Sequence, residues 1–424
     1  MGPAAASLHP ASTYDRTTGP DRPYWLRVAR EAADDLATDA VAREQAGKAP
    51  VDEVSRLREA GLLTPPVPAG AEAESEADDG ADGEGEGAGR GWAAAFAVVR
   101  EIAAADGAIA QLLGCHYFLS GSARFFAGPA LAARIEERSA AGRWCWGGGF
   151  ARQEPALTLA GTPGGLVLNG RQDYTTGVLV ADRLAVRATR ADTGTPLAVV
   201  VDTARRGVTV DGAADTFGRR LAAGGSVEFD EVAVAADEVL GPLSADEELL
   251  PPRAAMASPV AHLVAVQILL GTAEGTLAEA REYSRAGQAP PHPSWPVGSP
   301  HDPQVLTAYG ELTVLIRAAS ALAGQALDAV QGALALGDDL GYDAYAEVSA
   351  LVTMAEAAAS RAAQESTARA LDIVGPRAAS ARLGFDRFWR NARTHTLYEP
   401  VGHQLRDIGD YFLNGAHPPF ALPS

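Results

Sequence analysis

Short segments with the pattern of β-strands gather in the middle of this chain, between two long stretches with the pattern of helices. They alternate with period two or run as continuous apolar residues, and Gly, Asp and Asn separate them: LTLAG, GLVLNG, GVLVADRLAVRAT, PLAVVVDT, GVTVDG and SVEFDEVAV. They predict a compact β domain over residues 143–245. An order of helices, then a β domain, then helices again is uncommon, so it restricts the fold to few architectures.

The part before this domain has apolar residues at helical spacings of three and four, from Tyr24 to Gly61 and again from Trp92 to Phe126. Between them the segment Ala71–Gly91, AEAESEADDGADGEGEGAGRG, holds eight carboxylates and no base before Arg90. Such a run repels itself and has no apolar surface to bury. We therefore expect an N-terminal helical domain, residues 1–142, with a disordered acidic loop at residues 71–91.

The part after the β domain, residues 246–424, is helical again. From Met256 onward it consists of long alanine-rich segments of about 20 residues or more, a length that suits long antiparallel helices. We expect these segments to pack as a bundle.

Composition and charge limit the partners. The chain is 47% apolar and 21% charged, and its net charge of −19 argues against nucleic acid or an anionic membrane as partner. It has no apolar run of about 20 residues and no basic, apolar start typical of a signal peptide. The two cysteines, Cys115 and Cys145, make neither a disulfide framework nor a metal site. We expect a cytoplasmic protein.

One stretch near the C-terminus, GFDRFWRNARTHTLYEP (Gly384–Pro400), concentrates aromatic and basic residues in otherwise alanine-rich surroundings. On a helix, one broad face would carry Phe385, Phe388, Trp389, Ala392, His395 and Thr396. This places His395 beside bulky aromatic side chains. A histidine there is more often a hydrogen-bonded core residue than a catalyst, so the residues alone leave both roles open.

Several motifs resemble those of a flavoenzyme superfamily. LNGRQDYTTG is similar to the strand pair that lies against the flavin ring in the acyl-CoA dehydrogenase superfamily, and AREYSRA is similar to the helix that gives an arginine to the flavin phosphate. Within that superfamily the chain resembles the reduced-flavin monooxygenases, the dibenzothiophene monooxygenase group. The blocks that carry this likeness are ADGAIAQLLGCHYF, DEVLG, LGTAEGTLAEAREYSR, YGELT and GFDRFWRNARTHTLYEP with IGDYFLNG.

The resemblance implies a fold, a reaction and partners. The fold is mainly α with a central β domain: an N-terminal helical domain, a middle β-barrel domain and a C-terminal four-helix bundle. The reaction is oxygenation of a sulfur or nitrogen atom of a small organic molecule by reduced FMN and O2, through a flavin C4a-hydroperoxide. The sequence has no Gly-x-Gly-x-x-Gly fingerprint for a nicotinamide cofactor, so a separate NAD(P)H:flavin reductase would supply the reduced FMN by diffusion. The superfamily usually forms homotetramers.

The resemblance also assigns site residues. It implies catalytic roles for His395, which would face the flavin, and for His116, which would point into the substrate cavity, because imidazole can donate or take a proton at physiological pH. It implies flavin contacts by Tyr174, Thr176, Arg285, Asn391, Arg393 and the position of Gly148. Simpler roles stay open for three of these residues: a polar cap on a core helix for His116, a turn residue for Thr176 and a solvated helix end for Arg285.

Two departures separate this chain from the group. Gly148 stands where the group has an asparagine near the flavin, and Ala214 stands where it has a tryptophan. We therefore expect a pocket of different shape and carry no particular substrate over.

Two other functions compete with the monooxygenase. An FAD-dependent acyl-CoA dehydrogenase would use Glu399 as its base, although Pro400 and Val401 replace the Gly-Thr that normally follows this glutamate. A helical scaffold without flavin is the third possibility, and it would bind no flavin in a titration.

Overall fold

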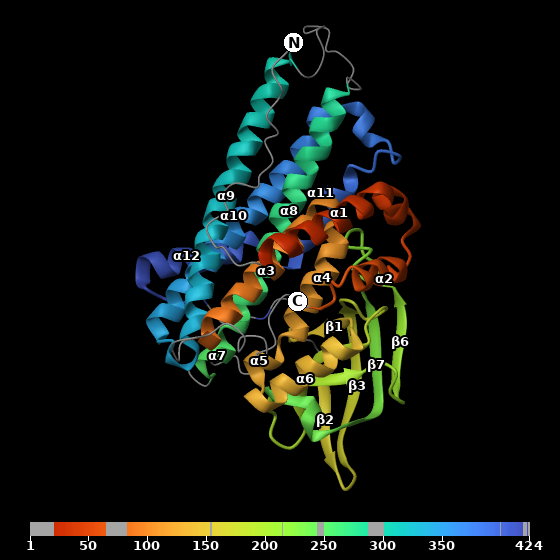
Figure 1. Ribbon diagram of the computed structural model, residues 1–424, viewed down its shortest axis with the longest axis vertical. Helices are drawn as coiled ribbons and strands as arrows, with labels where there is room; N and C mark the ends of the chain where they lie inside the picture. The colour runs from red at the N-terminus through yellow and green to blue at the C-terminus, as the bar shows by residue number, and fades with distance from the viewer. Residues whose placement is uncertain are drawn as a thin grey trace.

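The computed structural model of the chain describes residues 21–64, 83–152, 155–213, 215–243, 250–286, 301–398, 400–418 and 422. Its elements follow the helix–strand–helix order expected from the sequence. In Figure 1 the long helices occupy the upper and left parts of the molecule, and the strands gather at the lower right.

Helices of the N-terminal part precede the sheet: α1 (Asp21–Ala46), α2 (Val51–Glu59), α3 (Gly83–Ala105), α4 (Gly107–Ser120), α5 (Ala123–Phe126) and α6 (Pro129–Gly142). A side-chain cap separates α3 from α4. One oxygen of Asp106 accepts hydrogen bonds from the backbone N–H groups of Ala108 and Ile109, at 3.0 and 3.2 Å. These N–H groups have no partner within the helix, so the carboxylate fixes where α4 begins.

The acidic segment differs in part from the expected disordered loop. Helix α3 begins at Gly83, so residues 83–91 of the expected loop are helical. Buried residues from Trp92 onward hold the helix in place, and extending an existing helix costs less free energy than starting a new one. The remaining residues of that segment, 71–82, lie outside the described residues.

The strands form one mixed sheet: β1 (Trp146–Gly149), β2 (Leu157–Thr162), β3 (Gly165–Thr175), β4 (Arg183–Arg190), β5 (Pro196–Asp202), β6 (Val208–Ala213), β7 (Gly225–Val234) and β8 (Val239–Pro242). Their order is β6-β7-β3-β2-β4-β5-β8, with β1 paired in parallel to β4. Among the described strands the pairings run along an open path from β6 to β8. The middle domain expected from the sequence is thus a mixed β-sheet in this structure.

Helices return after the sheet: α7 (Pro252–Ala255), α8 (Ala257–Arg285), α9 (Pro303–Leu336), α10 (Tyr342–Val374), α11 (Asp386–Tyr398) and α12 (Val401–Asn414). The long helices α8, α9 and α10 pack along one another, while α3 packs against α8 and α9, and α12 against α10. Helix α11 touches α10, α8 and α4, so it lies between the bundle and the N-terminal helices.

Two helical spans are long and apolar enough to cross a membrane by length and composition alone. They are Pro252–Arg285, which contains α8, and Pro303–Asp339, which contains α9. The apolar window is 94% buried in the first span and 17% buried in the second. Helix α8 is thus a core helix, whereas α9 presents an apolar surface on the outside of the single chain.

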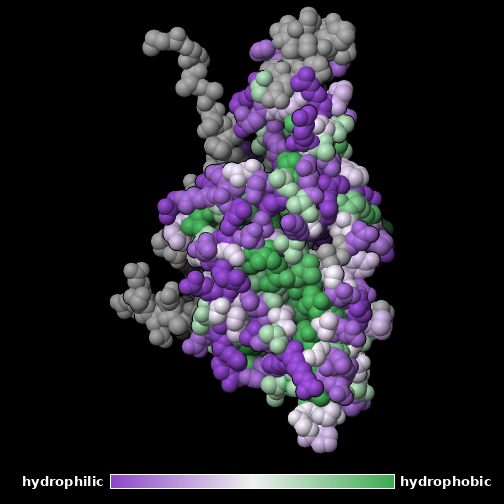
Figure 2. Space-filling view, turned by 90° about the vertical axis from the view of Figure 1, so that its right-hand side faces the viewer, coloured by the Kyte–Doolittle hydropathy of each residue, from purple (hydrophilic) through white to green (hydrophobic). Residues whose placement is uncertain are grey.

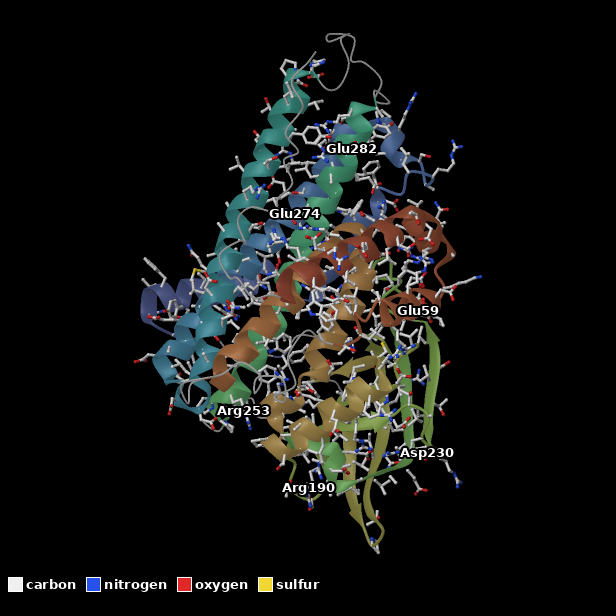
Figure 3. All side chains as sticks on the ribbon, viewed as in Figure 1. Glu59, Arg190, Asp230, Arg253, Glu274 and Glu282 are labelled. Carbon is white, nitrogen blue, oxygen red and sulfur yellow. The ribbon has the colours of Figure 1, made fainter. Side chains whose placement is uncertain are left out.

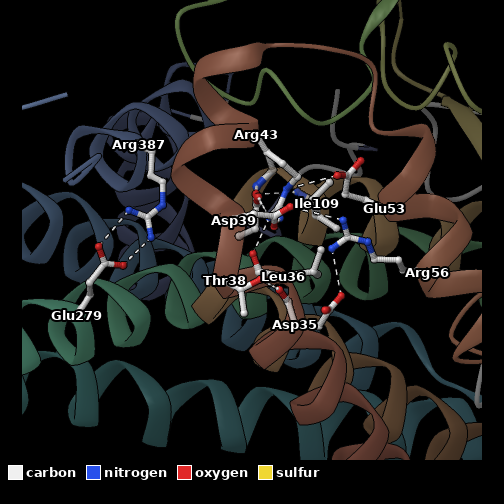
Figure 4. Close-up of polar contacts among 12 residues, drawn as sticks. Asp35, Leu36, Thr38, Asp39, Arg43, Glu53, Arg56, Ile109, Glu279 and Arg387 are labelled. Atoms are coloured by element: carbon white, nitrogen blue, oxygen red, sulfur yellow. Dashed lines mark hydrogen bonds and ion pairs between the residues drawn. The ribbon is translucent and has the colours of Figure 1, made fainter. Parts of the chain in front are cut away.

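A cluster around one buried arginine joins the N-terminal helices (Figure 4). Arg43 on α1 donates to Asp106 at 3.0 Å and forms ion pairs with Asp39 and with Glu53 on α2. The side chains of Arg43 and Asp106 are 8% and 7% exposed. Because Asp106 also caps α4, this Arg43 cluster fixes α1, α2 and the start of α4 relative to one another.

A second ion pair in Figure 4 fixes α11 to the bundle. Arg387 near the start of α11 donates to both carboxylate oxygens of Glu279 on α8, at 3.2 and 2.5 Å. Its guanidinium also lies 4.1 Å from the ring centre of Phe388. A two-point contact of this kind restrains orientation as well as position.

Candidate functional site

The stretch rich in aromatic and basic residues forms α11, and its apolar face is buried as expected. Phe385, Phe388 and Ala392 are buried, although Trp389 is partly exposed. His395 lies on this helix and is 6% exposed. Its Nδ1 is hydrogen-bonded to the guanidinium of Arg219, and its Nε2 is buried with no hydrogen-bond partner among the described residues. A buried polar atom without a protein partner is uncommon, and it leaves Nε2 available for a bound molecule.

The connection between β6 and β7 lies along α11. The Phe217 carbonyl accepts a hydrogen bond from Arg390 at 2.8 Å, and the backbone N–H of Arg219 donates to Asn391 Oδ1 at 2.7 Å. A Cβ on Gly218 would overlap the carbonyl oxygen of Arg390, so only glycine allows this approach. The segment Phe217–Arg219 is therefore held tightly against the helix.

A series of backbone contacts leads from this segment to β1. Leu179 and Gly177 donate to the carbonyls of Ala223 and Ala222, which follow Arg219 in the chain. Gly148 on β1 donates to the carbonyl of Thr176 at 2.9 Å. The structure thus connects four of the expected site residues, Gly148, Thr176, Asn391 and His395, through neighbouring contacts.

Only glycine fits at position 148 in β1. Its φ is +116°, and a Cβ would overlap the carbonyl oxygen of Ala185 on β4. The asparagine expected at this position from the resemblance would therefore require β4 to move. The next residue, Gly149, has open space where a Cβ would be, with no heavy atom within 4 Å.

The end of β3 offers further groups. Tyr174 is 63% exposed and has a φ of +54°, where the β3–β7 register shifts. The side-chain hydroxyl of the next residue, Thr175, is buried and has no hydrogen-bond partner among the described residues. A left-handed tyrosine costs backbone free energy, and such strain concentrates at functional sites.

His116 has a different environment from the one expected of a catalytic residue. It is fully buried, its Nε2 is 2.9 Å from the carbonyl oxygen of Leu63, and its Nδ1 accepts from the backbone N–H of Trp146 at 3.1 Å. Both ring nitrogens are thus used by the backbone, and neither is left for a substrate. This geometry favours the simpler alternative, a polar residue that ties a core helix to its surroundings, and the catalytic role of His116 stays an untested prediction. Burial lowers the pKa of His116 from 6.5 to about 4, with a smaller contribution from the Arg58 charge, while the bond to Leu63 opposes the change.

We expect His116 to make the protein less stable in mild acid. Between pH about 4 and about 6.5 the unfolded chain binds a proton at this residue and the folded protein does not, so the free energy of unfolding decreases as the pH falls through this window and levels off below it. The full effect is roughly 3 kcal/mol, since one pKa unit corresponds to about 1.4 kcal/mol. Urea unfolding over this pH range measures it. The His116→Gln variant, which cannot titrate, should lose that part of the slope, whereas His403→Gln on the exposed face of α12 should keep it. Equal slopes in all three proteins would contradict the assignment.

The two expected arginines lie apart from His395. Arg285 ends α8, is 62% exposed and has Glu282 at 3.8 Å; Figure 3 labels Glu282 at the upper end of this helix. Arg393 points toward α10, where it contacts Gln364 at 3.5 Å, and it also donates to Thr396 at 3.1 Å. Within this single chain neither residue contacts the Arg219–His395 pair in a described interaction.

Two expected positions and one cavity do not contribute to the contacts around His395. Ala214 and Glu399 lie outside the described residues, so the structure does not describe the departure at the first or the base proposed at the second. A cavity of about 510 Å³ lies beside α11 and is lined in part by Glu44, Phe217 and Arg220; His395 is not among its lining residues. Figure 2 shows an apolar area at about mid-height of one face, between largely hydrophilic regions.

Arg219 is the site residue that the sequence did not reveal. It occurs in a pair, Arg219-Arg220, within a polar connection, and only the first of the two contacts His395. Its charge also reaches Cys115, where it opposes the effect of burial; burial, with the nearby Cys145, raises the pKa of the Cys115 thiol to about 12. A thiol with a raised pKa is a poor nucleophile, so Cys115 has a packing role.

The chain is similar to known flavoenzymes along most of its length. Residues 263–402 match the family model described as "Acyl-CoA dehydrogenase, C-terminal domain". Dibenzothiophene monooxygenase of Mycolicibacterium goodii is 32% identical over 93% of this chain and 94% of that protein. The "Probable FMNH2-dependent monooxygenase SfnC" of Pseudomonas putida is 31% identical over 94% of this chain and 97% of that protein.

A solved structure agrees with these relatives. The crystal structure of FMN-bound TdsC from Paenibacillus sp. A11-2 has a TM-score of 0.84 and 30% sequence identity, over 94% of this chain and 99% of that chain. The expectations of an acyl-CoA dehydrogenase-like fold and of FMN as cofactor are thereby confirmed. The chain belongs to the acyl-CoA dehydrogenase superfamily, in its group of FMNH2-dependent monooxygenases, and is an oxidoreductase that uses reduced FMN.

Proposed function

We propose that this protein is the oxygenase of a two-component system that transfers one oxygen atom to a sulfur or nitrogen atom of a small organic substrate. The observation that carries this proposal is the buried Nε2 of His395, a polar atom without a described partner on the face of α11 that the Phe217–Arg219 segment covers. The names of the relatives support sulfur as the first atom to test, since dibenzothiophene is a sulfur heterocycle.

The residues present fit reduced FMN. A flavin needs hydrogen-bonding atoms along the edge of its ring and close backbone approach at its face. The buried, unpartnered His395 Nε2 and Thr175 Oγ1 offer the first, and the glycines of β1 offer the second. We propose that Gly148, Tyr174 and Thr176 line the flavin ring, that Asn391 holds the Arg219 backbone beside it, and that Arg393 stabilises α11 from the side of α10. Arg285 would bind the flavin phosphate of a neighbouring subunit.

Bound reduced FMN, with O2, would supply the oxygen-transfer chemistry, which we propose proceeds through a flavin C4a-hydroperoxide. The chain's own task is to hold a hydrogen-bond donor at one place and to exclude water from it. His395 meets both needs, because its side chain is buried, it lies on the helix face that carries Phe388 and Ala392, and Arg219 holds its Nδ1. A donor held in advance needs no reorientation during the reaction.

The test of this function is oxygenation with a substrate panel. We expect the protein, given reduced FMN and O2, to add one oxygen atom to at least one thioether, thiophene or amine, as detected by mass spectrometry. A flavin reductase kept behind a dialysis membrane should support the reaction, because reduced FMN would diffuse between the two proteins. Absence of oxygenated product from every class, with reduced FMN shown to bind, would contradict the proposal.

The cytoplasm is the proposed location, because a flavin reductase and its nicotinamide donor are found there. The three-domain division expected from the sequence, with boundaries after residues 142 and 245, is also proposed, in keeping with the order of helices and strands.

We expect a homotetramer in solution, with α9 in a subunit interface. This helix is long and apolar but only 17% buried in its apolar window, and Val314 on it is 69% exposed. Static light scattering should give four times the mass of one chain. Val314→Glu should weaken the assembly, whereas Val210→Glu on the edge strand β6 should not. A wild-type monomer at micromolar concentration would contradict the expectation.

A further inference from the structure

The contact between Arg219 and His395 determines more than the position of the imidazole. The guanidinium of Arg219 faces Nδ1 of the ring, and the connection that carries it comes from a different part of the chain, 176 residues away from His395. The other ring nitrogen, Nε2, is buried without a described partner. One side of the ring is therefore defined by the protein, and the other is left for a bound molecule.

A guanidinium has only N–H donors and keeps its charge in proteins. The ring nitrogen that faces it must therefore act as the acceptor, with its lone pair directed at Arg219. The single proton of the neutral imidazole is then on Nε2. A doubly protonated ring would place an N–H group against a cation, so this geometry disfavours it.

Arg219 is itself held on α11 at three successive positions of one helix face. Its backbone N–H donates to Asn391 Oδ1 at 2.7 Å, its guanidinium contacts His395, and it lies 6.0 Å from the ring centre of Tyr398. Its φ of +56° belongs to the left-handed region, which is unfavourable for arginine. A strained backbone persists only where surrounding contacts compensate for it, and here those contacts aim the guanidinium at His395.

We infer that Arg219 is a positioning residue that fixes His395 as the neutral Nε2–H tautomer, so that His395 acts in the site as a hydrogen-bond donor. This inference rests on the proposed function of His395 and makes it more specific. From the sequence alone, His395 could either donate or accept a proton. Beside Arg219 it presents one defined donor, the Nε2–H group. The arginine also keeps one positive charge next to the ring whatever is bound there.

The direct test reads the tautomer in flavin-free protein. Histidine labelled with 15N in the imidazole gives separate solid-state NMR signals for protonated and unprotonated ring nitrogens, and comparison with His395→Ala identifies the signals of this residue. At neutral pH the wild type should show an unprotonated Nδ1 and a protonated Nε2. A protonated Nδ1 in the wild type would overturn the inference without reference to any activity.

Variants separate the hydrogen bond from the charge. Arg219→Met removes the donor and should leave His395 as a mixture of forms. Arg219→Gln retains a neutral donor and Arg219→Lys a charged one, so both should recover the Nε2–H tautomer at least in part. Arg220→Met is the matched control, because it removes an exposed arginine at the next position, which lies against Gly47 just after α1. A normal tautomer in Arg219→Met would contradict the inference.

A coupled assay then tests the functional consequence. Arg219→Met should lower the product formed per reduced FMN consumed by about 10-fold or more, mainly through kcat, with hydrogen peroxide in place of product. Arg219→Lys should restore coupling and Arg220→Met should leave it unchanged. If the wild type has the expected tautomer but oxygenates no substrate, the proposed function fails while the assignment of Arg219 stands; if coupling is unaffected in Arg219→Met, the positioning role fails.

Discussion

The His395→Ala variant should lose oxygenated product by roughly 10²–10⁴-fold, the range typical of removing a group that handles protons in a reaction. The side chain lines a buried face of α11, and Phe388 and Arg387 hold the helix independently of it. Folding should therefore change little, and reduced FMN should still bind, with lower affinity, because the other proposed flavin contacts at β1 and at the end of β3 remain. Reduced FMN should still be oxidised, with hydrogen peroxide as the product, because the donor that directs oxygen to the substrate is gone.

Three quantities measured together decide this prediction: oxygenated product by mass spectrometry, hydrogen peroxide by a peroxidase assay, and FMN affinity by fluorescence. His403→Ala is the control, since this histidine is exposed on α12 and should have wild-type coupling. Full coupled turnover in His395→Ala would show that the reaction does not depend on this imidazole.

The largest effect on stability is expected at Arg43. Replacing it by methionine leaves Asp106 and Glu53 buried without their cation, and breaking a buried ion pair by removing one partner costs about 3–5 kcal/mol. We expect Arg43→Met to lower the free energy of unfolding by this amount and to loosen the start of α4, where Asp106 caps the helix. Urea unfolding monitored by circular dichroism measures the change.

A partly exposed arginine of the same region provides the control. Arg56 on α2 pairs with Asp35 and Asp39, but its side chain is 37% exposed. Exposed ion pairs contribute about 0–1 kcal/mol, so Arg56→Met should have little effect. Similar losses of unfolding free energy in both variants would mean that burial does not determine how much the Arg43 cluster stabilises the protein.

The outline of the fold could be predicted from the sequence because it depends on local patterns. Period-two segments indicated the strands of the sheet, and spacings of three and four indicated the long helices. The same reasoning placed His395 on the apolar face of α11, because the aromatic residues around it repeat at helical spacing. These signals lie within windows of ten to twenty residues, where periodicity is readable.

The arrangement of the site could not be predicted because it depends on contacts between distant residues. Arg219 meets His395 across 176 positions, and nothing in the Arg219-Arg220 pair indicates which arginine turns inward. His116 binds the carbonyl of Leu63, 53 residues earlier, and the N–H of Trp146, 30 residues later. Every residue has a backbone carbonyl and nearly every residue an N–H group, so the identities of Leu63 and Trp146 do not reveal these bonds. A structural histidine and a catalytic one therefore look the same in the sequence.

The two adjacent glycines of β1 bear on how such a site can change under selection. At residue 148 every other amino acid would collide with β4, so a substitution there would prevent correct folding whatever its effect on activity. At residue 149 a side chain has room, so a substitution there should allow folding and can be judged by its effect on activity. A mutant library at residue 149 should therefore yield mainly folded proteins, while one at residue 148 should yield mainly misfolded chains. Two adjacent positions of one strand thus differ in what limits their variation: folding at residue 148, and activity alone at residue 149.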